Sequence, residues 1–154
     1  DMTTPSYYAI SEYPAALPRR FLHPVGFGTL GAALPAALAT KCAFPERRVA
    51  ALAGDGGFQF TLPELAVGVQ ERIPLPVVLW NDGGFGEIRR CQQAKGGPRI
   101  AVDHWNPDFR ALAASYGIPY FAPGRGALED ALEEAFAEPV PSLIEVRNGK
   151  EFHR

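Results

Sequence analysis

Short apolar runs and longer amphipathic segments alternate along this chain. The runs are bounded by glycine, proline and aspartate and are rich in valine, leucine and isoleucine, which is typical of parallel strands buried on both faces. They predict strands over 49–53, 77–80, 118–121 and 142–146, and a further short strand over 20–23.

The amphipathic segments predict helices before and between these strands. Thr61 and Glu64 form a capping box at the start of one helix. Asn106, followed by proline, predicts the N-cap of another, which Gly117 closes. The remaining helices are expected over 6–13, 32–42, 85–91 and 127–137. Strands that alternate with helices indicate an α/β fold, a doubly wound, mostly parallel sheet with helices on both faces.

Composition narrows the class of protein. Of 154 residues, 47% are hydrophobic and 21% are charged, as in an ordinary globular domain that can bury a core. Fifteen basic and 17 acidic residues give a net charge of −2, which indicates neither a nucleic-acid nor a membrane-surface partner. No apolar run is long enough to span a membrane. Cys42 and Cys91 are isolated and form no CxxC pair, which favours reduced thiols and a cytoplasmic location.

Two loops carry an aspartate among glycines. One strand ends at Gly54-Asp55-Gly56, and the next ends at Asn81-Asp82-Gly83-Gly84. Two parallel strands joined by a helix place such loops side by side, where open α/β sheets bind ligands. Glycine lets the backbone approach an anion, and carboxylate oxygens suit Mg²⁺ or Ca²⁺ better than zinc. The residues predict a site for a metal and a phosphate; the alternative is a pair of turn-forming aspartates without a ligand.

A third glycine-rich segment, GFGTLG, covers residues 26–31 and precedes a predicted helix. It approximates a dinucleotide fingerprint, but no clear strand comes before it. A nicotinamide-dependent dehydrogenase is therefore the weaker interpretation.

The spacing of the two aspartate loops resembles that of a known family. Twenty-four residues lie between Gly56 and Asn81. GDG, a gap of this length and an asparagine at the strand end together resemble the signature of thiamine diphosphate enzymes. Up to about Val146, the chain resembles the C-terminal, pyrophosphate-binding domain of the acetolactate synthase, pyruvate oxidase and benzoylformate decarboxylase family. The resemblance implies that residues 1–154 form one domain, the third of three in a larger enzyme.

The resemblance implies that Mg²⁺ bridges the protein and the diphosphate of thiamine diphosphate. The metal ligands would be the side chains of Asp55 and Asp82 and the backbone carbonyl of Gly84. Asp82 departs from the family's asparagine and adds a negative charge beside the diphosphate. The residues implied in cofactor binding are Thr3, Thr4, Gly28, Leu30, Gly56, Gly57, Phe85 and Gly86.

Leu30 has a further implied role, as the bulky apolar residue that holds the cofactor folded, with its aminopyrimidine nitrogen against thiazolium C2. Considered without the family, Leu30 is a core leucine beside a turn. The family's activating glutamate belongs to a separate N-terminal domain, usually of a neighbouring subunit. We therefore expect a homo-oligomer, and an isolated chain that binds the cofactor without turnover. No catalytic residue is assigned within the chain.

The implied reaction is that of a 2-oxo acid decarboxylase or an acetolactate synthase-like carboligase. In both, the cofactor adds to the carbonyl of a 2-oxo acid and CO₂ leaves. Protonation then gives an aldehyde, whereas attack on a second carbonyl gives a carboligation product. The alternative is a non-catalytic domain that keeps the fold for assembly or regulation, and Asp82 is its only support in the sequence.

Three further polar features have two interpretations each. His104 is expected to be a solvent-side loop histidine, with a proton shuttle as the alternative. For His23, contact with the substrate is the less favoured interpretation, and a residue without such a role is the more favoured one. Glu87 and Arg90 have the spacing of a solvated ion pair, while a basic residue at 89 or 90 that binds a substrate carboxylate is the competing hypothesis.

Overall fold

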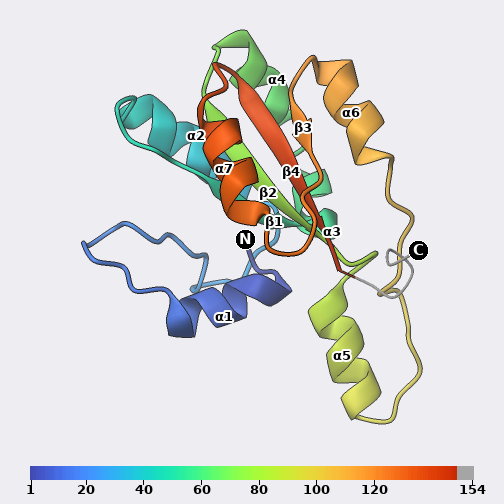
Figure 1. The fold of residues 1–154 in the computed structure, drawn as a ribbon. Helices are drawn as coiled ribbons and strands as arrows, with labels where there is room; N and C mark the ends of the chain where they lie inside the picture. The colour runs from blue at the N-terminus through green and yellow to red at the C-terminus, as the bar shows by residue number, and fades with distance from the viewer. Residues whose placement is uncertain (149–154) are drawn as a thin grey trace.

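A computed structural model describes residues 1–148, which fold around a four-stranded sheet in the order β1-β2-β4-β3 (Figure 1). All pairs of neighbouring strands are parallel, so the strands end at the same edge of the sheet. The strands are β1 (Ala51–Gly54), β2 (Leu75–Asn81), β3 (Tyr120–Phe121) and β4 (Pro141–Arg147).

Helices cover both faces of this sheet. Residues of α2, α4 and α6 share a core with one face, and α7 packs on the other. Within residues 1–148, no helix has the combination of length and apolar character needed to cross a membrane. The helices are α1 (Thr4–Glu12), α2 (Ala33–Ala43), α3 (Asp55–Phe60), α4 (Glu64–Gln70), α5 (Gly86–Ala94), α6 (Phe109–Tyr116) and α7 (Leu128–Phe136).

The alternation of side chains along β2 explains why two cores form. Leu75, Val77 and Leu79 are fully buried in the larger core beneath α2, α4 and α6. Val78 points the opposite way and packs in the smaller core with Ile144 and residues of α7. A run that is apolar at every position is what a strand covered on both faces requires. The predicted α/β class, with helices on both faces, is confirmed.

Two helices contribute little to either core. None of the residues described in α5 is buried, and Ser6 is the buried residue of α1. Both helices lie beyond the edge where the strands end (Figure 1). Their position makes them walls of a site at this edge rather than layers over the sheet.

The structure corrects two of the predicted boundaries near glycine-rich loops. Residues 20–23 form no strand and belong to the long loop between α1 and α2. The GDG segment is not a simple loop, because α3 begins at Asp55, directly after β1. This short helix turns the chain sharply, and two glycines in its first turn allow close packing against the neighbouring loops.

The predicted C-cap of α6, Gly117, is confirmed, but both predicted N-caps are wrong, and for related reasons. The hydroxyl of Thr61 donates to the carbonyl oxygen of Gly31 at 2.9 Å, so it does not cap α4, whose N-cap is Pro63. The cap of α6 is Asp108, which accepts hydrogen bonds from the first turn of the helix. Asn106 lies two residues earlier and its side chain bonds elsewhere. In each case a tertiary hydrogen bond takes the side chain that the local pattern assigned to the helix.

Candidate functional site

The ends of β1 and β2 place the two aspartate loops next to each other. Gly54, the last residue of β1, pairs with Trp80 of β2. Asp55 follows as the first residue of α3, and residues 82–85 lead from β2 into α5. Both helices therefore begin at the same edge of the sheet, which is where parallel α/β sheets bind ligands.

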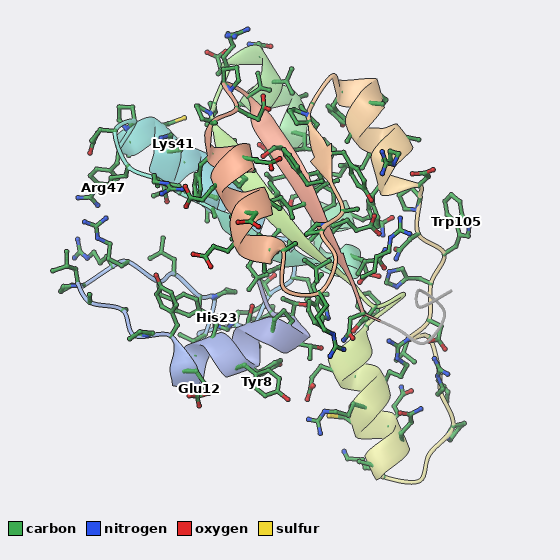
Figure 2. The ribbon with its side chains drawn as sticks, in the orientation of Figure 1. Tyr8, Glu12, His23, Lys41, Arg47 and Trp105 are labelled. Carbon is green, nitrogen blue, oxygen red and sulfur yellow. The ribbon has the colours of Figure 1, made fainter. Side chains whose placement is uncertain are left out.

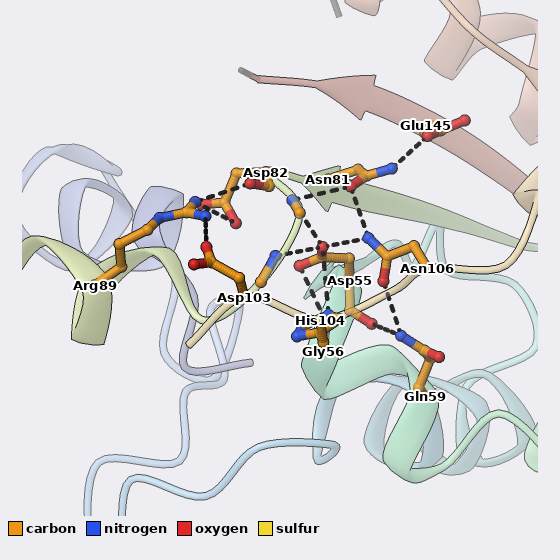
Figure 3. A network of polar contacts seen from close by, with 12 residues as sticks. Asp55, Gly56, Gln59, Asn81, Asp82, Arg89, Asp103, His104, Asn106 and Glu145 are labelled. Carbon is orange, nitrogen blue, oxygen red and sulfur yellow. Dashed lines mark hydrogen bonds and ion pairs between the residues drawn. The ribbon is translucent and has the colours of Figure 1, made fainter. Parts of the chain in front are cut away.

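Asp55 is the centre of a hydrogen-bond network between these loops (Figure 3). The residue is only 2% exposed. Its Oδ2 accepts hydrogen bonds from the backbone N–H of Gly83 and Gly84, both at 3.0 Å, and from Nδ2 of Asn106 at 2.6 Å. Its Oδ1 accepts from the N–H of Gly56 at 3.0 Å. One buried carboxylate thus fixes the start of α3 to the loop after β2.

Asn106 extends this network to the end of β2. Its Nδ2 also donates to Oδ1 of Asn81 at 3.0 Å, and its Oδ1 accepts from Gln59 of α3 at 3.0 Å. Asn81 in turn donates to Oε1 of Glu145 at 2.6 Å. The network therefore ties α3, β2, β4 and the loop before α6 into one unit around Asp55.

Glu145 is a carboxylate that stays charged inside the sheet. It is 2% exposed, and burial by itself would raise its pKa. Hydrogen bonds from Arg147, Tyr120 and Asn81 outweigh burial, so the pKa of Glu145 lies below its ordinary value. Burial and the hydrogen bond to Glu145 raise the pKa of Tyr120 to about 12, so its hydroxyl remains a donor.

Asp82 is the second carboxylate at this edge, and its environment differs from that of Asp55. Burial first, and then the charge of Asp55, raise the pKa of Asp82 to about 6, although Arg89 opposes the shift. Nη2 of Arg89 lies 3.5 Å from Oδ1 of Asp82 and donates to the backbone carbonyl of Asp82 at 2.8 Å. Nη1 of Arg89 donates to Asp103 at 2.8 Å. Arg89 thus joins Asp82 to the loop after α5.

That loop contributes a segment, residues 102–106, that runs against the loop after β2. The N–H of Phe85 donates to the carbonyl of Val102 at 2.8 Å, and Gly84 forms an antiparallel bridge with Asp103. A Cβ at Gly84 would lie 2.1 Å from the Val102 oxygen. Gly84 must therefore be glycine because the 102–106 segment approaches so closely.

All the residues that the sequence implicated in metal or cofactor binding line one cavity of about 180 Å³. It is bounded by α1, the 26–31 turn, α3 and the start of α5. The lining includes Thr3, Thr4, Gly28, Leu30, Asp55, Gly56, Gly57, Asp82, Gly84, Phe85 and Gly86. Their separate roles stay predictions, but residues up to 83 positions apart now face the same space.

Comparison with known proteins identifies the family of this chain. Residues 1–146 match the thiamine pyrophosphate enzyme family, C-terminal TPP binding domain. The chain belongs to this family. Parallel α/β sheets bind ligands at the edge where their strands end, and Asp55 and Asp82 lie at that edge.

The relatives of this TPP-binding domain are longer proteins, and the chain matches one part of each. A probable 2-ketoarginine decarboxylase of Pseudomonas aeruginosa is 38% identical over 150 residues, which are 96% of this chain and 27% of the relative. The acetolactate synthase large subunit of Haemophilus influenzae is 36% identical over 84% of the chain and 23% of its own length. That of Lactococcus lactis is 35% identical over 92% of the chain and 25% of its own length. The chain thus spans about a quarter of each of these relatives.

Of the other polar candidates in this TPP-binding domain, Glu87 lines the cavity, whereas His23, His104 and Arg90 do not. His23 is in the loop above α1 and does not line it (Figure 2). His104 is not a solvent-side residue as predicted, because it packs edge-on against Phe85, with ring centroids 5.1 Å apart, and its Nε2 lies 3.6 Å from Asp55. Arg90 forms the predicted pair with Glu87, at 3.1 Å. Trp105, the residue after His104, points away from the domain (Figure 2).

The sequence does not reveal the role of several residues that hold the site. Asn106 has a local signal, because it precedes a proline, but that signal predicts a helix cap. Glu145 lies on a strand where a charged residue has no distinctive local pattern. For Arg89 the sequence suggests a substrate carboxylate as the partner, whereas the structure places it against Asp82. Asp1 accepts hydrogen bonds from the N–H of Gly31 at 3.0 Å and thereby holds the turn that carries Leu30. These contacts join residues far apart in the chain, and no local pattern encodes them.

We predict that Asn106→Ala lowers the free energy of unfolding by about 1–3 kcal/mol, because it removes one donor from each of two buried acceptors, Oδ2 of Asp55 and Oδ1 of Asn81. Urea denaturation followed by circular dichroism measures the loss. Gln93→Ala, on the exposed face of α5, is the matched control and should change the free energy by less than about 0.5 kcal/mol. Equal effects of the two substitutions would contradict the role of Asn106.

The raised pKa of Asp82 predicts a pH-dependent stability of the metal-free chain. The folded state binds this proton more tightly than the unfolded state, so the stabilisation is complete below pH 3.8 and is lost as the pH rises through about 6. Asp82→Asn has no such carboxyl. Its free energy of unfolding, relative to wild type, should therefore rise by on the order of 2 kcal/mol between about pH 4 and pH 7. Urea unfolding without metal at both pH values tests this prediction. If the difference in free energy of unfolding between the two proteins does not depend on pH, the pKa of Asp82 is not raised in the folded state.

Proposed function

We propose that this domain binds thiamine diphosphate through Mg²⁺ as part of a 2-oxo acid decarboxylase or an acetolactate synthase-like carboligase. The observation that carries the proposal is the shared cavity, in which Asp55, Asp82 and Gly84 lie beside the glycines at the start of α3 and α5. The names of the relatives support both reactions, since one is a decarboxylase and others are acetolactate synthases.

The oxygen groups at the cavity fit Mg²⁺. Two carboxylates and a backbone carbonyl are hard ligands, as this cation prefers. Within residues 1–148, no group of three or more His, Cys, Asp or Glu side chains is placed to hold a metal by itself. A cation here would complete its octahedral coordination with diphosphate oxygens and water, which is how Mg²⁺ binds in phosphate sites.

The surroundings of these ligands fit a diphosphate. Gly56 and Gly57 are buried in the first turn of α3, and Gly86 is the first residue of α5, a helix of nine residues. Helix N-termini present a partial positive charge to an anion, and the N–H groups that Asp55 does not accept from can donate to it. Thr3 and Thr4, where α1 begins on the opposite side, offer hydroxyl groups to the same cavity.

The apolar part of the cavity fits the two rings of the cofactor. Leu30 is half-buried and lines the cavity beside Gly28, on a turn fixed by Asp1. We infer that Leu30 supports the folded conformation and that the backbone of Gly28 and Leu30 bonds the pyrimidine edge. When bound, the cofactor supplies a nucleophilic carbon and the electron sink for decarboxylation. The protein holds it, orients it and excludes water.

The proposal includes a catalytic part outside this chain. Glu87 lines the cavity but pairs with Arg90, and Glu12 points outward from the end of α1 (Figure 2). We propose that the activating glutamate comes from another domain, usually of a second copy, in a homo-oligomer. The chain by itself should then bind the cofactor without turning over a 2-oxo acid.

Calorimetric titration of thiamine diphosphate with and without Mg²⁺ tests the proposal. We expect binding that requires the metal and weakens by at least about 100-fold in Asp55→Asn, which removes the charge but keeps the side-chain shape. Glu134→Ala, on the exposed side of α7, removes a carboxylate far from the cavity and should bind as wild type does. Circular dichroism confirms that each variant is folded.

Two results would contradict this assignment. Binding that is independent of Mg²⁺ would remove the metal bridge. A folded wild-type protein that binds no thiamine diphosphate, with or without the domains that complete the enzyme, would favour the non-catalytic alternative.

A further inference from the structure

The cavity contains two carboxylates of like charge. Asp55 is 2% exposed and the side chain of Asp82 is 11% exposed, so water screens their repulsion weakly. A diphosphate would bring further negative charge to the same place. An uncompensated second carboxylate would therefore oppose the binding of an anionic cofactor.

Arg89 is placed to compensate that charge. It lies on α5, one residue beyond Ile88 of the cavity lining, and its side chain is 19% exposed. One nitrogen, Nη2, contacts Asp82 twice, at 3.5 Å to the carboxylate and at 2.8 Å to the backbone carbonyl (Figure 3). The guanidinium thus holds the backbone of Asp82 by a hydrogen bond and places its charge within ion-pair distance of the carboxylate.

Arg89 is itself held from the opposite side. Its Nη1 donates to Asp103 at 2.8 Å, and Asp103 also pairs with Arg99. The backbone of Asp103 bridges to Gly84, the residue whose carbonyl is proposed as a metal ligand. Arg89 therefore spans two loops that are already joined, and it is not free to bind a substrate carboxylate.

We propose that Arg89 is a positioning residue for the cation site: it neutralises and orients the Asp82 carboxylate, so that this site can hold two carboxylates beside a bound diphosphate. The inference rests on the proposed function and deepens it. It makes a specific claim about coupling, namely that the site needs the charge of Arg89 because residue 82 is an aspartate.

A double-mutant cycle measures this coupling. The affinity for thiamine diphosphate at saturating Mg²⁺ is determined by calorimetry for wild type, Arg89→Met, Asp82→Asn and the double variant. Arg89→Met should weaken binding by about 10–100-fold in the wild-type background, as loss of a group that orients a metal ligand does. In the Asp82→Asn background the same substitution should weaken binding by less than about 3-fold, because no charge remains to be neutralised.

A conservative variant and a distant control complete the experiment. Arg89→Lys keeps the charge but lacks the planar fork that reaches both Asp82 and Asp103, so its loss should be intermediate. Arg48 precedes β1 and forms an exposed ion pair with Glu133, with Nη2 2.7 Å from Oε1. Arg48→Met breaks this distant pair and should not change the affinity for thiamine diphosphate. Thermal unfolding of the unliganded proteins reports any general loss of stability.

The outcomes separate this inference from the proposed function. Equal losses from Arg89→Met in both backgrounds would mean that Arg89 acts through the backbone carbonyl alone, and would overturn the inference while the cofactor site stands. Wild-type affinity in Arg89→Met would also overturn it. If wild type binds no thiamine diphosphate in the presence of Mg²⁺, the proposed function fails and the inference fails with it.

Discussion

The buried carboxylate of Asp55 is the interaction on which the arrangement of the loops depends. A charge with 2% exposure requires compensation, and Asp55 obtains it from two backbone N–H groups of the next loop and from the amide of Asn106. These partners come from separate parts of the chain, so satisfying one carboxylate fixes the relative position of three segments. Hydrogen bonds within the chain itself thus fix the relative position of the loops that line the cavity.

The segment 102–106 has a structural role that its sequence does not reveal. Val102 pairs with the loop after β2, Asp103 anchors Arg89, and Asn106 reaches Asp55. This segment therefore contacts Asp55 directly and Asp82 through Arg89, and it does so from outside the cavity. A loop that follows a solvent-exposed helix can in this way control the geometry of a site to which it contributes no lining residue.

The sequence predicted the fold and the residues that line the cavity better than it predicted the hydrogen bonds and ion pairs that join distant parts of the chain. The apolar run of β2 and the glycine loops were evident because parallel strands and close backbone approach leave local patterns. The capping roles given to Thr61 and Asn106 were wrong, since each side chain bonds a partner more than 20 residues away. The partners of Arg89 and Glu145 could not be predicted, because a charged residue reveals its partner only after the chain has folded.

The claim that unites these observations is that a cation joins Asp55, Asp82 and Gly84 to a diphosphate. The most direct test is a crystal structure with thiamine diphosphate and Mn²⁺ in place of Mg²⁺, in which the metal is located by its anomalous scattering. We expect one Mn²⁺ bonded to both carboxylates and to the Gly84 carbonyl oxygen, and also to oxygens of the diphosphate. A diphosphate in the cavity without a metal between it and these residues, or a metal bound elsewhere, would contradict the account.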